Sequence, residues 1–219
     1  MKTFYSFAHV INEQAQEASS SGFVIPFAFP EYSPKIDDPK SLGSKILSWI
    51  GRGLTSGGDT STYGKLGHGG IGIVNSNGSV RMFEFGRYPG HKEGYGITRM
   101  RSSKVPAIIK DGEITNLEQV VKGIKAVTYP PGPSMQMKYV AIKAPNVKGA
   151  LDFAKQTVKV PMEYDITDFS IASDENDANC GTFALQTVKA AGVKIPDFCF
   201  AWPTAMITEL SPFGTSGTL

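Results

Sequence analysis

Two apolar stretches joined by a short polar turn constrain the fold of this chain more than any other feature of its sequence. GHGGIGIV (67–74) is followed by NSNGS (75–79) and then by VRMFEFGRY (80–88). An Asn-Gly pair between apolar runs is a strong hairpin signal, so we expect two antiparallel strands here. Glycine weakens a strand, and the glycines of the first stretch therefore mark the close approach of a backbone, a ligand or a tightly packed helix.

Further strands and helices are expected on both sides of this hairpin. The segment YGITRMR (95–101) continues the strand pattern, and MKYVAIKA (137–144) gives another strand. Apolar residues at helical spacing predict four helices. One covers 41–50, one follows a capping box at Thr115 and Glu118, and one follows an Asn146 cap. The fourth covers 180–191 and ends at Gly192. Because the strands cluster centrally with helices around them, the sequence predicts the α+β class.

The composition is that of an ordinary globular protein. With 219 residues, 41% hydrophobic and 19% charged, we expect one domain over 1–219, in which residues 1–60 form an irregular or partly helical N-terminal segment. A net charge of +2 is too small to point to nucleic acid or an anionic membrane as a partner. No stretch approaches the roughly 20 apolar residues of a membrane span, and the polar N-terminus predicts synthesis in the cytoplasm without a signal peptide.

Cys180 is the first candidate for chemistry. It lies in the first turn of a predicted helix, capped by Asp177 or Asn179, where unpaired backbone N–H groups and the helix dipole favour a thiolate. The same N–H groups can donate hydrogen bonds to the oxyanion that forms when a thiolate attacks a carbonyl. The alternative is a small core residue that packs the helix against the sheet, which is also the simplest interpretation of Cys199, the other cysteine.

A histidine is needed to stabilise such a thiolate, and His68 is the best candidate because it opens the glycine-rich strand. Its alternative role is that of a half-exposed strand histidine. Glu84, in the second strand of the hairpin, is a candidate to orient it, but the register decides whether it can. A turn of two or four residues would pair His68 with Arg87, whereas a five-residue turn over 75–79 puts Glu84 and His68 on one face.

A metal site is a further alternative for the same residues. His68, His91, Cys180 and Cys199 are all metal-binding residue types, but no two of them have the short spacing of a zinc motif. The sequence therefore favours nucleophilic catalysis over metal binding.

The strings GHGGIGIV, FEFGRYPG, YGITRMR and NCGTFALQTVKAAG together resemble a known family. They are similar to the permuted NlpC/P60 (papain-like) hydrolases, and within these to peptidoglycan-directed toxins of bacterial type VI secretion, the TseH-like effectors. The likeness covers about residues 64–100 and 175–192, and in it the histidine strand precedes the cysteine helix. The resemblance implies a papain-like fold in which the cysteine helix packs on an antiparallel sheet.

The resemblance also implies an activity. It assigns Cys180 as nucleophile, His68 as its base and Glu84 as the following polar residue, with no metal or organic cofactor. The expected reaction is amide hydrolysis in the peptide stems of peptidoglycan, by a toxin that a secretion apparatus delivers into the periplasm of a target cell and that an immunity protein neutralises in the producer. Two alternatives remain open: a lipid or acyl-ester hydrolase or acyltransferase of the same fold, and a catalytically silent binding module.

Overall fold

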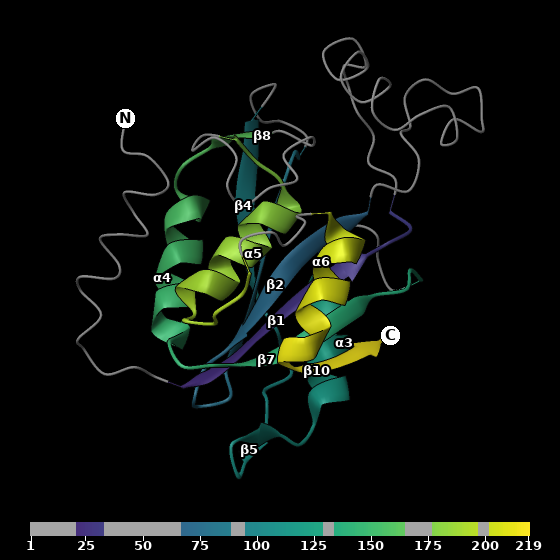
Figure 1. Ribbon diagram of the computed structural model, residues 1–219, viewed down its shortest axis with the longest axis vertical. Helices are drawn as coiled ribbons and strands as arrows, with labels where there is room; N and C mark the ends of the chain where they lie inside the picture. Colours follow the sequence, from purple (N-terminus) through teal and green to yellow (C-terminus); the bar gives the residue numbers. More distant parts are fainter. Residues whose placement is uncertain (1–20, 33–66, 89–94, 129–133, 165–176, 197–201) are drawn as a thin grey trace.

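The computed structural model describes residues 21–32, 67–88, 95–128, 134–164, 177–196 and 202–219 (Figure 1). The helix predicted over 41–50 lies outside these residues. The strands are β1 Gly22–Phe29, β2 His68–Val74, β3 Val80–Gly86, β4 Tyr95–Ser102, β5 Ile109–Lys110, β6 Glu113–Ile114, β7 Lys138–Ala144, β8 Met162–Tyr164, β9 Asp177–Ala178 and β10 Thr215–Thr218. The helices are α3 Leu117–Val127, α4 Val147–Val158, α5 Cys180–Ala190 and α6 Pro203–Leu210, with a 3-10 turn at Ser211–Phe213.

One large sheet organises the molecule. Its strand order is β10-β7-β1-β2-β3-β4-β8-β9, and every neighbouring pair is antiparallel except β8 and β9. The predicted hairpin is its centre, formed by β2 and β3 around the five-residue turn, where Asn75 and Ser79 are joined by a backbone hydrogen bond of 2.9 Å. The α+β class, the antiparallel sheet and the strands expected from the sequence are therefore confirmed.

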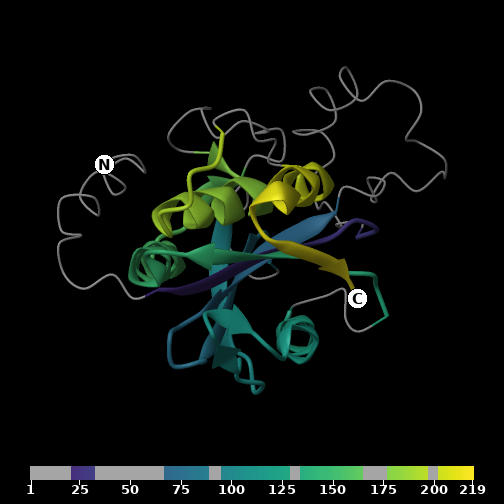
Figure 2. The same ribbon diagram turned by 60° about the horizontal axis from the view of Figure 1, so that its bottom comes forward.

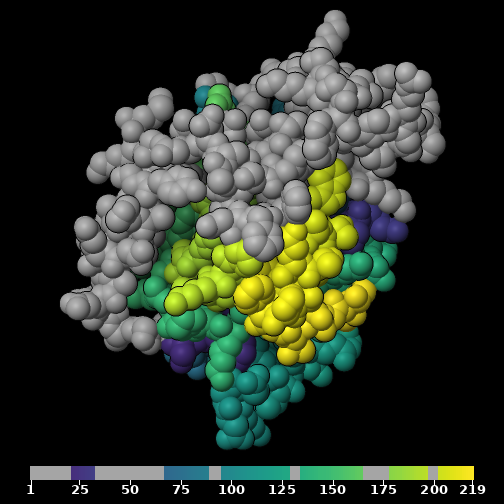
Figure 3. All heavy atoms as spheres, viewed as in Figure 1, coloured from purple at the N-terminus to yellow at the C-terminus, as the bar shows by residue number. Residues whose placement is uncertain are grey.

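Helices cover both faces of this sheet (Figure 2). Helices α4, α5 and α6 lie on one face, and their core includes Phe83, Phe85 and Phe183. Helix α3 lies on the opposite face, over a second core that includes Phe27 and Ile124. In the space-filling view, α5 and α6 lie side by side on the first face (Figure 3). No helix in the described part of the chain is long and apolar enough to cross a membrane.

Strand β1 corrects the expectation of an irregular N-terminal segment. Residues 22–29 (GFVIPFAF) form a central strand between β2 and β7, and all eight are buried. A strand buried on both faces is apolar throughout and lacks the alternation by which sequence analysis finds strands. Pro26 also argued against a strand, because proline cannot donate a ladder hydrogen bond. Pro26 is tolerated because the pairing with β7 is interrupted between Val24 and Phe27.

Two of the three predicted helix caps are confirmed, those at the starts of α4 and α5. The Asn146 side chain accepts a hydrogen bond from Gly149 N at 2.9 Å at the start of α4, as predicted. The capping box predicted at Thr115 is wrong. Helix α3 begins one residue later, after Asn116, and the Thr115 hydroxyl donates instead to Ile108 O at 3.1 Å. A loop contact thus takes the hydroxyl that would otherwise have capped the helix.

Candidate active site

The first turn of α5 holds Cys180 in a fixed position. Asn179 caps this helix, and its Oδ1 accepts hydrogen bonds from Gly181 N at 2.8 Å and Thr182 N at 3.0 Å. The Thr182 hydroxyl in turn accepts from Asn179 N at 2.8 Å, which completes a reciprocal capping box. Because all these groups are buried, the backbone on both sides of Cys180 is rigidly held, and Cys180 itself is only 5% exposed.

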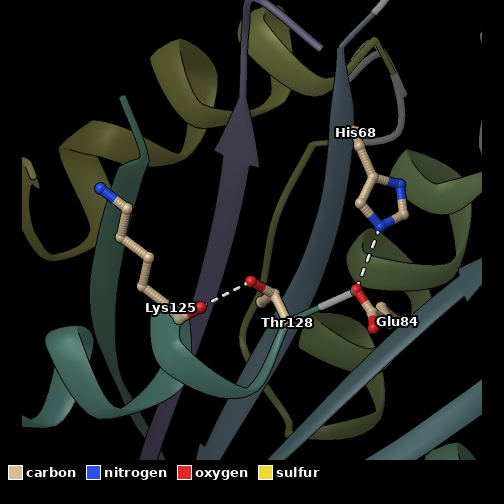
Figure 4. A network of polar contacts seen from close by, with 4 residues as sticks. All are labelled: His68, Glu84, Lys125 and Thr128. Atoms are coloured by element: carbon tan, nitrogen blue, oxygen red, sulfur yellow. Dashed lines mark hydrogen bonds and ion pairs between the residues drawn. The ribbon is translucent and has the colours of Figure 1, made fainter. Parts of the chain in front are cut away.

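The hairpin register brings Glu84 to His68. Val74 pairs with Val80 and Ile71 with Phe83, which is the register of the five-residue turn. Glu84 therefore shares a face with His68, and His68 Nε2 lies 3.1 Å from Glu84 Oε2 (Figure 4). The Glu84 carboxylate is completely buried. A buried carboxylate needs a charged or hydrogen-bonding partner, and the imidazole of His68 supplies it.

Cys180 is the second group that acts on His68. Its side chain, like that of Glu84, favours the protonated imidazole as a hydrogen-bonding neighbour and by its charge. Burial on its own would lower the pKa of His68, but the hydrogen bonds and negative charges of Cys180 and Glu84 outweigh it and raise the pKa from 6.5 to about 10. At neutral pH the ring is consequently an imidazolium between two acidic groups.

Two glycines explain why the sequence of β2 is so unusual. Gly67, directly before His68, has a φ of +78°, which favours glycine, and its N–H donates to Tyr32 O at 2.8 Å. A Cβ at Gly70 would lie 2.6 Å from Phe27 Cζ and 2.7 Å from Phe83 O. The close approach of a neighbouring backbone, expected from the glycines, is therefore confirmed for β3. The missing side chain at Gly70 leaves room for Glu84 beside β2.

Two tyrosines complete the surroundings of the pair. Tyr164, at the end of β8, pairs with Ala178, two residues before Cys180, and burial together with the charge of Cys180 raises the pKa of Tyr164. The Tyr32 ring lies beside the His68 ring, with centroids 5.6 Å apart. Neither residue was found from the sequence, because each lies in a short segment without periodicity or motif. Only the tertiary contacts identify them.

The metal alternative cannot be assembled from the described residues. His91 and Cys199, two of its four ligands, lie outside them. Within the described ranges no three His, Cys, Asp or Glu side chains gather as a metal site would require. The geometry that the structure does contain is that of Cys180, His68 and Glu84.

Comparison with known proteins places the chain in a family. The model of the family described as type VI secretion system effector TseH-like matches residues 24–194, well over half of the chain. This chain belongs to the TseH-like effectors. The crystal structure of the type VI secretion system effector TseH is 22% identical, with a TM-score of 0.57, over 92% of this chain and 93% of that one. No curated protein matches the sequence significantly.

Membership of the TseH-like family confirms the resemblance found in the sequence. The matched range runs from β1 through the end of α5, and so includes the hairpin and the cysteine helix. The structural likeness to TseH shows that the two chains share the fold. The chain is accordingly a type VI secretion effector by family, with the cysteine helix packed on the antiparallel sheet.

Proposed function

We propose that this effector is a cysteine amidase or endopeptidase that cleaves the peptide stems of bacterial peptidoglycan. The observation that carries the proposal is the placement of His68, whose Nε2 lies 3.1 Å from the buried Glu84 carboxylate and whose protonated form is favoured by the nearby Cys180 side chain. A nucleophile, a base and a group that orients the base are the three parts of a cysteine hydrolase.

The raised pKa of His68 defines its part in the reaction. At neutral pH the imidazole already carries a proton, and a neighbouring positive charge favours attack by a cysteine sulfur as a thiolate. The thiolate attacks the amide carbonyl carbon, and the imidazolium gives its proton to the leaving nitrogen as the C–N bond breaks. The neutral imidazole then takes a proton from water, whose oxygen attacks the thioester and releases the acid product and the thiolate.

Two donors are available for the oxyanion that forms during the attack. The Asn179 side chain occupies the N–H groups of Gly181 and Thr182, while the N–H of Cys180 has no hydrogen-bond partner among the described residues. Tyr164 is a neighbour of the thiol, since Cys180 contributes to the rise in the pKa of Tyr164. We expect both groups to donate hydrogen bonds to a carbonyl oxygen bound at the sulfur.

Membership of the effector family supports the proposed substrate and partners. A type VI effector is delivered into a neighbouring cell, and peptidoglycan in the periplasm is the amide-rich target that the permuted NlpC/P60 resemblance implies. We expect an immunity protein that protects the producing cell, and a component of the secretion apparatus that carries the effector. These partners, and delivery to the periplasm, form part of the proposal.

Mass spectrometry of the reaction products tests this function. Purified peptidoglycan and phospholipid vesicles are incubated separately with the wild-type protein and with Cys180→Ala, His68→Ala and Cys199→Ala. We expect new stem-peptide fragments from the wild type and from Cys199→Ala, which controls for loss of a cysteine as such, and none from the other two variants. The mass of the fragments identifies the bond.

Other products would redirect or refute the assignment. Fatty acid released by the wild type alone would move the function to ester hydrolysis on the same fold. Peptide fragments that persist in Cys180→Ala would show that another group, or a contaminant, performs the cleavage. No product from either substrate would favour a binding module.

A further inference from the structure

The Tyr88 ring lies over the part of β3 that carries Glu84. Side chains alternate along a strand, so Gly86 is the next position after Glu84 on the same face of β3. A Cβ at Gly86 would lie 3.3 Å from Tyr88 Cζ and 3.4 Å from the Tyr88 hydroxyl oxygen. The ring therefore folds back over the strand, towards Glu84, and fills the space that the glycine leaves. It is only 8% exposed.

Arg99 holds this ring from the neighbouring strand. Arg99 of β4 pairs directly with Glu84 of β3, so both side chains leave the sheet on one face. The guanidinium carbon of Arg99 lies 3.7 Å from the centroid of the Tyr88 ring, which is a close cation–π contact. Gly86 and Arg99 are thus immediate neighbours of Glu84, one along β3 and one across to β4. A ring that contacts both of them also lies beside Glu84.

The charges and the burial agree with this placement. Burial raises the pKa of Tyr88, the negative charge of Glu84 raises it further, and the positive charge of Arg99 lowers it. Glu84 is completely buried, Tyr88 is nearly so, and Arg99 is partly exposed. Exposure increases in this order, as expected if the tyrosine ring lies between the carboxylate and solvent.

Exclusion of water strengthens the contact that Glu84 makes with His68. Glu84 Oε2 lies 3.1 Å from His68 Nε2 (Figure 4). Water would compete for the carboxylate oxygens and would screen the attraction between the two side chains, whereas in a dry site the same hydrogen bond is stronger. A side chain that keeps this contact dry therefore helps to hold the imidazole in its orientation.

We propose that Tyr88 is a positioning residue that covers the Glu84 carboxylate and keeps water from its hydrogen bond with His68, and that Arg99 holds Tyr88 in place. The inference rests on the proposed function and deepens it, because the imidazolium must keep its proton until the leaving nitrogen takes it. Tyr88 and Arg99 would act through Glu84 and His68, and would take no part in bond breaking.

NMR titration of His68 in the full chain tests this cover independently of catalysis. Tyr88→Ala admits water to the pair, so the pKa of His68 should fall from about 10 towards 6.5, by roughly one unit. Tyr88→Phe retains the ring and its cation–π contact, and should keep the wild-type pKa. Arg99→Lys keeps the charge but loses the planar stack, and should give a smaller fall. Tyr88→Leu should give an intermediate fall, and it decides the matter if Tyr88→Ala does not fold.

Tyr139→Ala is the matched control. Tyr139 is also 8% exposed, and its ring likewise lies over a glycine, Gly217 of the neighbouring strand β10. Its loss should leave the pKa of His68 unchanged. An unchanged pKa in both Tyr88→Ala and Tyr88→Leu, an equal fall in Tyr139→Ala, or a fall in Tyr88→Phe as large as in Tyr88→Ala would each overturn the cover. An unchanged pKa in Arg99→Lys would overturn the part assigned to Arg99.

Cleavage of peptidoglycan by the same variants separates this inference from the proposed function. In Tyr88→Ala the alkaline limb of the pH–rate profile should move to lower pH by the same amount as the pKa of His68. If the pKa falls as expected but the wild type cleaves nothing, the hydrolase is refuted and the cover stands. If the wild type cleaves and the pKa does not move, the cover is refuted and the hydrolase stands.

Discussion

Replacing Glu84 by Gln removes one charge from the candidate active site with little change of shape. The glutamine keeps a side-chain oxygen that can accept a hydrogen bond from His68 Nε2, which now lies 3.1 Å from the carboxylate. The geometry of the ring should therefore persist. What is lost is the negative charge that helps to hold the proton on His68.

The size of the effect follows from the burial of the pair. Glu84 is fully buried and His68 is 7% exposed, so solvent screens their interaction little. A hydrogen bond to a charged group contributes about 1.5–3 kcal/mol and a neutral one about 1 kcal/mol. The loss of about 0.5–2 kcal/mol corresponds to a decrease of about one unit in the pKa of His68.

NMR titration of the histidine rings measures this pKa directly. The chain has three histidines, and the His68 signal is assigned by its loss in His68→Asn. Glu118→Gln is the control, since it removes a carboxylate that is 63% exposed and paired with Lys122. We expect a lower His68 pKa in Glu84→Gln alone. An unchanged pKa in Glu84→Gln, or equal shifts in both variants, would refute the argument that the buried carboxylate holds the proton.

Three further predictions concern the helix cap, the strand packing and pH. Asn179→Ala and Asn146→Ala should each lower the free energy of unfolding by about 1 kcal/mol, but only Asn179→Ala should slow alkylation of the active-site thiol by iodoacetamide; equal rates would contradict a positioning role for the cap. Gly70→Ala should destabilise by about 1–3 kcal/mol in urea unfolding, and more than Gly69→Ala, whose nearest contact is 3.0 Å against 2.6 Å; the reverse order would show that the strands move apart easily. Because folding raises the pKa of His68 from 6.5 to about 10, the stability lost in His68→Asn should be constant below pH 6.5 and shrink as the pH rises through 10; a loss that grows with pH would contradict the sign.

The local patterns of the sequence identified most of the elements that form the site. The hairpin of β2 and β3, the cap at Asn146 and the helix that begins at Cys180 were all found from alternation, helical spacing and turn residues. These features depend on neighbours within a few positions, which a sequence displays directly. By contrast, β1 escaped detection because its partners on both faces are distant in sequence and leave no periodic signature.

The sequence by itself determined the chemical types that could react: a cysteine at a helix start, a histidine at a strand start and an acid in the neighbouring strand. Only the tertiary structure decided that they meet. The turn of five residues set the register that gives Glu84 to His68, and the packing of α5 on the sheet brought Cys180 to the same ring. Tyr164 joined the site in the same way, because contacts across more than ten residues are fixed by packing of whole elements and not by local spacing.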